Sequence, residues 1–352
     1  MTAIRNYYSF GGYYLLVVTL ALTIGQTIQQ SDFDYNYKSI YGENGQVDND
    51  DDDGNIIDDD NRIFAPLDNA NDKAYILPIS KPIGQITGLG INSKGYLLAF
   101  HRADRIWNQW SFDKYNNFNA SLGPIKNATI YAIDPISGKI MAEYGKDAFY
   151  MPHGLTIDCH DNIWVTDVGS HQVFKYDKNF KLLMKLGEHL KPGSDKRHFC
   201  KPTDVAVARN GHFFVADGYC NSRIMKFDQN GKLLAEIGHF NGFGEAVNNQ
   251  FSIPHSIALI EDLNLICVAD RENERIQCFS AGIADEQRAL PTGMLITKAE
   301  SVGRIYAIRE KSNRLNYFGI ENAHCLAISD DGIVYVGQTG PKQIVQISLL
   351  DQ

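Results

Sequence analysis

The chain has 352 residues, of which 44% are hydrophobic, and carries a formal net charge of −9. This apolar content is enough for a packed core and excludes global disorder. The nine acidic residues between positions 43 and 60 equal the whole net charge, so the rest of the chain is formally neutral. A neutral body lacks the basic surface of a nucleic-acid-binding protein, and no nucleic-acid partner is expected.

The first 26 residues are predicted to be a signal peptide. Arg5 provides the positive start, and residues 13–24 form an apolar stretch that is too short to cross a bilayer comfortably. An uncleaved anchor is the alternative, but no stable membrane span is expected. Residues 27–73 are acidic and predict a disordered spacer. The folded domain is therefore expected at 74–352.

Two glycosylation sequons agree with export. Asn119 lies in Asn-Ala-Ser, and Asn127 lies in Asn-Ala-Thr. The expected location is the secretory pathway, with the protein either secreted or held in a secretory granule lumen.

The centre of the chain repeats with a period of about 50 residues, which is typical of propeller blades. Each copy reads as four short strands, as in 203–208, 213–217, 223–228 and 232–237. Three copies each begin near a proline, at Pro152, Pro202 and Pro254. The second strand of each of these copies ends with an aspartate, at Asp167, Asp217 and Asp270.

Weaker copies run from residue 86 to 144 and from 325 to 348, and one more blade is expected from 283–318. The last copy lacks an outer strand, which 74–79 could supply and so close the ring. The predicted fold is an all-β, six-bladed β-propeller of NHL-like repeats, with five or seven blades as alternatives.

Three histidines occupy the same position of the repeat, at the start of the first strand: His153, His255 and His324. Their counterparts in other blades are Thr87 and Thr203. In a six-bladed ring the histidines fall in alternate blades, about 120° apart, so they can hold one metal ion and leave a coordination position open. A single histidine there is usually structural, but three in alternate repeats favour a metal site.

The turns after the second strands face the same channel mouth, and they carry Arg102, Tyr219 and Arg271. Two guanidinium groups beside a metal suit a substrate with a carboxylate. A tyrosine close to cations can have a lowered pKa and act as a base. For each residue alone, surface charge or packing is the simpler interpretation.

The cysteine spacing agrees with this strand layout. Cys267 and Cys278 lie opposite each other across a predicted hairpin, where a disulfide can form. Cys200 and Cys220 lie near one face of the disc, where a bond would fix the loop of Tyr219. Two cysteines are left over and either pair or stay free: Cys159 and Cys325.

Several segments together resemble the peptidyl-α-hydroxyglycine α-amidating lyases across about residues 75–349. The most specific are FHRADRIW at 100–107, MPHGLTI at 151–157 with WVTDV at 164–168, ADGYC at 216–220 and IPHSI at 253–257. The resemblance implies a six-bladed propeller that binds zinc and a structural calcium ion.

By this resemblance, zinc is held by the three histidines, Arg102 and Tyr219 are catalytic, and Arg102 and Arg271 bind substrate. Calcium is held partly by the backbone carbonyls of Leu89 and Leu155. The disulfides implied are Cys200–Cys220 and Cys267–Cys278.

One position departs from the family pattern. The family has Met-Pro-His-Asp around its third histidine, whereas this chain has Asn322-Ala323-His324-Cys325. A thiol replaces a calcium-binding carboxylate poorly, so calcium binding is expected to be weak or absent.

The implied reaction converts a peptidyl-α-hydroxyglycine into an amidated peptide and glyoxylate. The substrate is expected to come from a separate copper monooxygenase. One alternative is a catalytically impaired, secreted propeller that acts as a binding protein. Another is a calcium-dependent lactonase-type propeller, which would need a channel of Asp, Asn and Glu where this chain has histidines.

Overall fold

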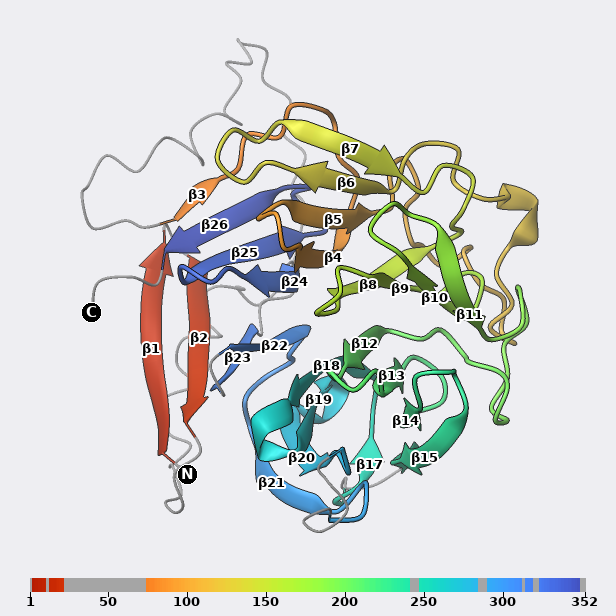
Figure 1. Ribbon diagram of the computed structural model, residues 1–352, viewed down its shortest axis with the longest axis vertical. Helices are drawn as coiled ribbons and strands as arrows, with labels where there is room; N and C mark the ends of the chain where they lie inside the picture. The colour runs from red at the N-terminus through yellow and green to blue at the C-terminus, as the bar shows by residue number, and fades with distance from the viewer. Residues whose placement is uncertain are drawn as a thin grey trace, which may run out of the picture.

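Repeated antiparallel sheets build the computed structural model, which describes residues 2–10, 13–21, 74–240, 247–283, 290–311, 314–318 and 323–348. The predicted spacer, 27–73, lies outside the described residues. Within them there is no α-helix, and no helix is long and apolar enough to cross a membrane. The all-β propeller predicted from the repeats is confirmed (Figure 1).

The described residues form six four-stranded sheets, and five of these are complete blades around a central channel. From the channel outward they are β4 (Ile86–Ile91), β5 (Leu97–His101), β6 (Ile130–Ile133) and β7 (Ile140–Tyr144); β8 (Pro152–Ile157), β9 (Ile163–Asp167), β10 (Gln172–Tyr176) and β11 (Leu182–Leu186); β12 (Asp204–Val207), β13 (Phe213–Asp217), β14 (Arg223–Phe227) and β15 (Leu233–Ile237); β18 (Pro254–Ile260), β19 (Leu265–Asp270), β20 (Arg275–Ser280) and β21 (Leu295–Ala299); and β24 (Ala323–Ile328), β25 (Ile333–Gln338), β26 (Ile344–Ser348) and β3 (Ala74–Ile76).

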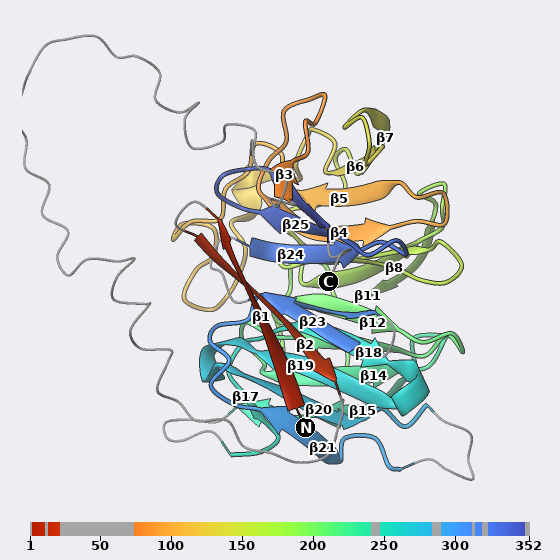
Figure 2. The same ribbon diagram turned by 90° about the vertical axis from the view of Figure 1, so that its left-hand side faces the viewer.

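The last blade is closed by an early segment of the chain. β3 pairs with β26 through Ile76↔Val345 and Ala74↔Ile347, and Figure 2 shows β3 lying beside this blade. This closure, which the sequence predicted, joins two distant parts of the chain in one sheet and covers the edge of β26.

The region from which the sequence predicts a further blade supplies only a hairpin. It consists of β22 (Ala307–Lys311) and β23 (Arg314–Phe318). Because β24 follows so closely, this region has no length for two more strands. The described part of the chain therefore has five complete blades and not six.

The hairpin nevertheless fills a place in the ring. β22 packs between β18 and β24, so six inner strands surround the channel: β4, β8, β12, β18, β22 and β24. β23 also pairs at Leu315↔Leu20 with β2 (Tyr13–Ala21), which pairs with β1 (Thr2–Phe10). Both N-terminal strands lie in the segment predicted to be a signal peptide. The separate short strands β16 (His239–Phe240) and β17 (Gln250–Phe251) pair in parallel.

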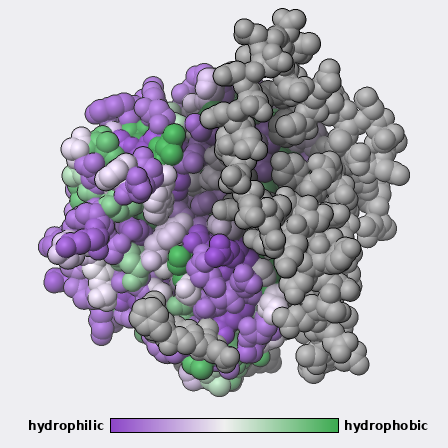
Figure 3. All heavy atoms as spheres, turned by 180° about the vertical axis from the view of Figure 1, so that it is seen from behind, coloured by the Kyte–Doolittle hydropathy of each residue, from purple (hydrophilic) through white to green (hydrophobic). Residues whose placement is uncertain are grey.

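The core is divided among the contacts between neighbouring blades. Phe100, Phe149 and Val165 pack between the first and second blades, and Phe214 and Phe279 between the third and fourth. Figure 3 shows that the coloured part of the face opposite to that of Figure 1 is mostly hydrophilic, with scattered hydrophobic residues. The apolar side chains therefore serve mainly to hold adjacent sheets together.

The repeated aspartates of the sequence are structural clamps. The buried carboxylate of Asp167 accepts hydrogen bonds from the backbone N–H of Tyr150 (2.6 Å) and Met151 (2.8 Å), just before His153. The equivalent aspartates repeat this contact at 2.7 Å, from Cys200 to Asp217 and from Ser252 to Asp270. Each clamp fixes the loop that leads into an inner strand.

Candidate active site and metal centre

The three predicted histidines meet in the channel. The imidazole rings of His153, His255 and His324 have centroids 4.7–4.8 Å apart in all three pairs, and they offer ligand atoms within 4.8 Å of one another. This nearly equilateral arrangement, called here the histidine tier, places one donor from each of β8, β18 and β24 around one point. Three nitrogen donors with an open fourth side fit a tetrahedral metal ion.

A backbone carbonyl on the next inner strand orients each ring. Each histidine has Nδ1 within hydrogen-bonding distance of a carbonyl oxygen: His153 with Thr203 (2.8 Å), His255 with Tyr306 (2.6 Å) and His324 with Thr87 (3.1 Å). Because Nδ1 must carry the proton to donate, Nε2 keeps its lone pair for a metal. Thr87 and Thr203, the counterparts of the histidines in other blades, thus orient His324 and His153 through their backbone carbonyls.

Burial keeps these imidazoles uncharged. It lowers the pKa of His153 and His255 well below the usual value, with neighbouring histidines and arginines acting in the same direction. Burial also lowers the pKa of His324 to about 3, assisted by Arg102 and Arg271. All three side chains are therefore neutral at physiological pH, which is the form that binds metals.

Gly154 allows the close strand approach on which the His153 contact depends. A Cβ atom at this position would lie 2.4 Å from the carbonyl oxygen of Thr203 and 3.0 Å from Oγ1 of Thr166. No side chain fits between β8 and β12 at this point, so the glycine keeps Thr203 within reach of the imidazole.

Tyr219 reaches the histidine tier from the turn after β13. Its hydroxyl oxygen lies 3.0 Å from Nε2 of His153 and 3.2 Å from Nε2 of His255. Burial raises the pKa of the phenol, although Arg271 and Arg102 act in the opposite direction. The lowered pKa expected from the sequence is therefore wrong, because the loss of solvation outweighs the two nearby charges.

Arg102 is also buried, at 4% exposure, and its orientation is fixed. Its Nε donates to the carbonyl of Pro152 (3.1 Å), and Nη1 donates to Oε1 of Gln85 (3.0 Å). Burial lowers its pKa to about 10, which leaves it cationic at neutral pH. The guanidinium lies 5.3 Å from the ring centroid of Trp107, whose ring is 5.0 Å from that of Tyr219. Sequence reasoning gave Trp107 no role, yet its ring contacts both predicted catalytic side chains.

Arg271 completes the group. Its guanidinium lies 5.6 Å from the ring centroid of Tyr219 and 5.0 Å from that of Tyr306, and its Nε donates to Glu272 (2.8 Å). Arg102, Tyr219 and Arg271 therefore meet beside the histidine tier, as predicted. Together they offer two cations and a phenol next to three metal-binding nitrogens.

The residues predicted to hold calcium do not fit that ion. The carbonyl oxygen of Leu155 lies 3.4 Å from Nη2 of Arg309, so a guanidinium stands beside the expected ligand. Leu89 is buried in β4, close to Cys325. Burial raises the pKa of the Cys325 thiol, which is therefore neutral and offers calcium no oxygen. A positive neighbour and a neutral thiol are a poor environment for a divalent cation.

Both predicted disulfides are present. Cys200 is bonded to Cys220 and Cys267 to Cys278, and the second pair are direct cross-strand partners in β19 and β20. The first bond joins the loop before β12 to the turn that carries Tyr219. The two left-over cysteines do not pair: Cys159 is exposed, and Cys325 is buried.

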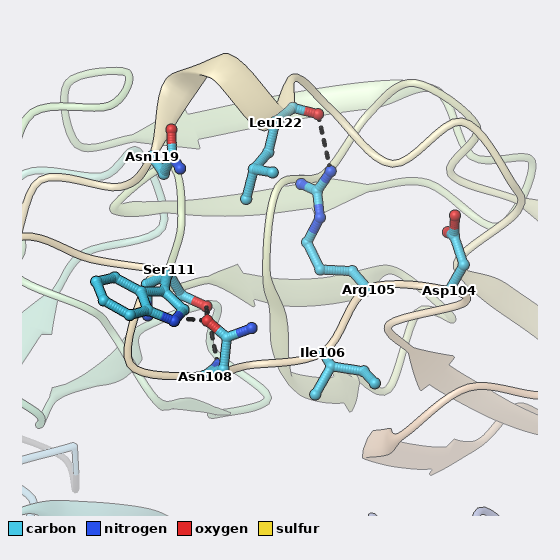
Figure 4. Close-up of a pocket in the computed structure, with 8 residues that line it drawn as sticks. Asp104, Arg105, Ile106, Asn108, Ser111, Asn119 and Leu122 are labelled. Carbon is cyan, nitrogen blue, oxygen red and sulfur yellow. Dashed lines mark hydrogen bonds between the residues drawn. The ribbon is translucent and has the colours of Figure 1, made fainter.

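A surface cavity of about 370 Å³ lies in the loop after β5 and shares no residue with the histidine tier. In Figure 4 the Arg105 guanidinium points to the carbonyl of Leu122, at 2.9 Å. Asn119 lies at this cavity and is exposed, as is Asn127, so both predicted glycosylation positions are on the surface. The converging side chains, and not this cavity, mark the candidate active site.

Comparison with known proteins extends this result. Residues 149–176, 199–227 and 251–279 match the NHL repeat. The chain is 50% identical over 298 residues to a probable peptidyl-alpha-hydroxyglycine alpha-amidating lyase of Caenorhabditis elegans, with 77% of this chain and 84% of the relative covered. It is 46% identical over 205 residues to peptidyl-alpha-hydroxyglycine alpha-amidating lyase 1 of Drosophila melanogaster, covering 56% of this chain and 38% of the relative.

The chain also matches part of a longer relative. It is 38% identical over 308 residues to the peptidyl-glycine alpha-amidating monooxygenase of Mus musculus, covering 79% of this chain but only 31% of the mouse protein. Among solved structures, a streptogramin B lyase covers 78% of the chain and 97% of its own length, with 16% identity and a TM-score of 0.47. The sequence relationships, and above all the match to the worm protein, place this chain in the family of peptidyl-alpha-hydroxyglycine alpha-amidating lyases, enzymes that act on a carbon–nitrogen bond.

Proposed function

We propose that this protein is a zinc-dependent lyase that cleaves peptidyl-α-hydroxyglycine into a C-terminally amidated peptide and glyoxylate. The observation that carries the proposal is the position of the Tyr219 hydroxyl, 3.0 and 3.2 Å from two Nε2 atoms of the histidine tier. A phenol, which can accept a proton once it has lost its own, thus lies next to the proposed metal position.

Zinc is the metal that fits these donors best, since it favours tetrahedral sites with neutral imidazole ligands. When bound, it supplies a Lewis acid and lowers the pKa of a coordinated hydroxyl group. His153, His255 and His324 would hold it through Nε2, with the open side directed at the substrate.

The substrate is a carbinolamide, and its reaction moves one proton and one electron pair. Tyr219 first releases its phenol proton to solvent, which the charges of Arg271 and Arg102 favour. The phenolate then accepts the proton of the α-hydroxyl, the oxygen forms the carbonyl of glyoxylate, and the carbon–nitrogen bond breaks. The bonding electrons go to the amide nitrogen, which gains one proton and leaves as the amidated peptide. The proton that Tyr219 accepts balances the one that the nitrogen needs.

The two arginines bind and orient the substrate in this proposal. The carboxylate of the α-hydroxyglycine residue pairs with guanidinium groups, which present parallel donors to its two oxygens. Arg102 is already fixed by Pro152 and Gln85, so little orientation entropy is lost on binding. Arg271 lies across the Tyr219 ring and supplies the second cation.

We further propose that the protein works in the secretory pathway, either secreted or in a granule lumen. Two disulfides and two exposed sequons support this location. The substrate would be made by a separate copper monooxygenase. The match to the mouse peptidyl-glycine alpha-amidating monooxygenase supports a link between this chain and a hydroxylation step.

The test is glyoxylate release from a synthetic peptidyl-α-hydroxyglycine by the purified full chain, with and without a chelator. Chelator-sensitive turnover, restored by zinc, is the expected result. Absence of turnover by protein that carries zinc would overturn the lyase proposal and leave a binding propeller. Turnover that survives complete metal removal would overturn the role of zinc.

A further inference from the structure

Directly past the histidine tier, the inner strands carry a second group of polar residues that the reaction does not use. Asp204 follows Thr203 on β12, Ser256 follows His255 on β18, and both are at most 4% exposed. Arg309 on β22 extends toward them and is 19% exposed at its side chain. We call Arg309, Asp204 and Ser256 the channel cluster.

Arg309 links four of the six inner strands. Its Nη1 lies 2.9 Å from Oδ2 of Asp204, 3.1 Å from Oγ of Ser256 and 2.8 Å from the carbonyl of Ile308 on its own strand. Its Nη2 lies 3.4 Å from both Oδ1 of Asp204 and the carbonyl of Leu155 on β8. One guanidinium thus contacts β8, β12, β18 and β22.

Asp204 is held on both sides. Besides the ion pair with Arg309, its Oδ2 accepts from the hydroxyl of Ser256 (2.7 Å) and from the backbone N–H of Ile257 (3.1 Å). A buried carboxylate needs a cation, and here the chain supplies one. Asp204 directly follows Thr203, whose carbonyl orients the ring of His153. Ser256 directly follows His255, a member of the histidine tier.

The expected calcium site and the guanidinium of Arg309 compete for the same place. Leu155, an expected calcium ligand, contacts Arg309, and the carboxylate expected at position 325 is a thiol. The fixed positive charge of the guanidinium repels a divalent cation across the few ångströms between them.

We propose that Arg309 is the built-in cation of this channel, which ties the inner strands together beneath the histidine tier and takes the place of a bound calcium ion. Arg309 contacts Ser256 on β18, the strand of His255, and the Leu155 carbonyl on β8, the strand of His153, so it is a positioning residue. The inference concerns the scaffold and holds whether or not the protein cleaves α-hydroxyglycine peptides.

The first experiment compares melting temperatures of metal-stripped full-length protein with and without millimolar calcium, together with titration calorimetry using calcium alone. We expect no calcium-dependent shift and no calcium heat in the wild type, whereas zinc raises the melting temperature. A clear rise with calcium in the wild type would overturn the proposal.

The second experiment removes the cation. Arg309→Met should lower the melting temperature by about 5 °C, because the buried Asp204 loses its cationic partner. Arg309→Lys should recover part of the loss. Arg209→Met is the matched control, since Arg209 is 73% exposed at its side chain and pairs with carboxylates on the surface. Equal effects of the Arg309→Met and Arg209→Met substitutions would contradict the proposal.

A positioning role also predicts a change at the metal. With cobalt(II) in the histidine tier, Arg309→Met should alter the visible absorption bands, whereas Arg209→Met should leave them unchanged. If Arg309→Met does not fold, Ser256→Ala provides the same spectroscopic comparison through a smaller change. Unchanged spectra in the folded variants would show that the cluster does not position the histidines.

Cys325→Asp tests the exclusion of calcium directly. The new carboxylate should pair with Arg309, so the single variant should remain insensitive to calcium, whereas Arg309→Met/Cys325→Asp should gain a calcium-dependent rise in melting temperature. An equal calcium response of both variants, or none in the double variant, would show that Arg309 is not what excludes the ion.

Discussion

The hydroxyl oxygen of Tyr219 lies 3.0 Å from Nε2 of His153, the nitrogen that faces the point where a metal ion would bind. The proposed base and the proposed metal site therefore share one hydrogen bond in the structure. Because Nδ1 of His153 is directed at Thr203, Nε2 accepts this bond from the phenol. Metal binding and proton transfer are thus coupled in space, but separate substitutions can distinguish them.

Replacing His153 with alanine should remove the metal and the activity together. Two imidazoles hold zinc much more weakly than three, so we expect turnover to fall by about 1000-fold or more. Glyoxylate release and elemental analysis of the purified variant measure both effects. His160→Ala, a change at an exposed histidine, is the control and should keep both. Normal activity in His153→Ala protein would refute the proposed metal site.

Tyr219→Phe should remove the chemistry and keep the metal. The three Nε2 atoms remain available, so the zinc content should stay near one ion per chain, whereas kcat should fall by about 10²- to 10⁴-fold through loss of the proton acceptor. Steady-state kinetics and metal analysis on the same preparation distinguish the two outcomes. A kcat close to that of the wild type would mean that another group accepts the proton.

Arg102→Lys should weaken the orientation of the substrate. A lysine keeps the charge but cannot bond Pro152 and Gln85 while presenting parallel donors to a carboxylate. We expect kcat/KM to fall by about 10- to 100-fold, equivalent to about 1.4–2.8 kcal/mol. The exposed change Arg209→Lys should have no effect, and an equally harmless Arg102→Lys would exclude a specific guanidinium role.

Gly154→Ala should destabilise the protein and loosen the metal site. The added methyl group would lie 2.4 Å from the carbonyl of Thr203, so β8 and β12 must separate. We expect a loss of about 2–3 kcal/mol in the free energy of unfolding and weaker zinc binding. Denaturant unfolding and competition with a zinc chelator measure these two quantities.

The control for this substitution is Gly95→Ala. A methyl group there contacts no atom, and the only strain comes from the positive φ of 78°. The free energy of unfolding should therefore fall by about 1 kcal/mol, without any change in zinc affinity. If the Gly154→Ala and Gly95→Ala proteins bind zinc with equal affinity, the close approach of β8 and β12 does not matter to the metal site.

The stability of the loop before β12 should depend on the charge of His198. Hydrogen bonds from this imidazole to Asp195 (2.8 Å) and Glu188 (2.9 Å) raise its pKa. The folded state thus binds the proton of His198 more tightly than the unfolded chain does. The stabilisation from the charged imidazole is therefore complete below the unfolded pKa of 6.5, and it is lost as the pH rises through the folded pKa.

His198→Asn should therefore lower the melting temperature slightly at about pH 6 and change it less at about pH 9. Thermal melts of both proteins at the two pH values test this directly. A loss that is equal at both pH values would mean that the imidazole acts through packing and not through its charge.

The sequence was most informative where the repeat is regular. His153, His255 and His324 could be grouped because each follows the same register at a strand start, and register decides which side chains face the channel. The same reasoning placed Arg102, Tyr219 and Arg271 at the mouth, and the pairing of Cys267 with Cys278 followed from the hairpin between them.

The sequence was less informative where the repeat pattern is weak and where opposing electrostatic effects decide a pKa. Arg309 comes from the region without a clear pattern, so neither its place in the channel nor the missing blade could be predicted. The pKa of Tyr219 depends on the balance between burial and two arginines, which a linear sequence does not give. The role of Tyr306 could not be predicted either, because its backbone carbonyl and not its side chain orients His255.

The hydrogen bond between His324 and Thr87 joins residues 237 positions apart. His324 lies in β24, and Thr87 lies in β4, which belongs to the first complete blade in chain order. A growing polypeptide therefore has no finished set of three nitrogens until β24 has been translated. Metal loading by all three histidines must follow translation of His324, and an intact metal centre reports that the blades of β4 and β24 have met.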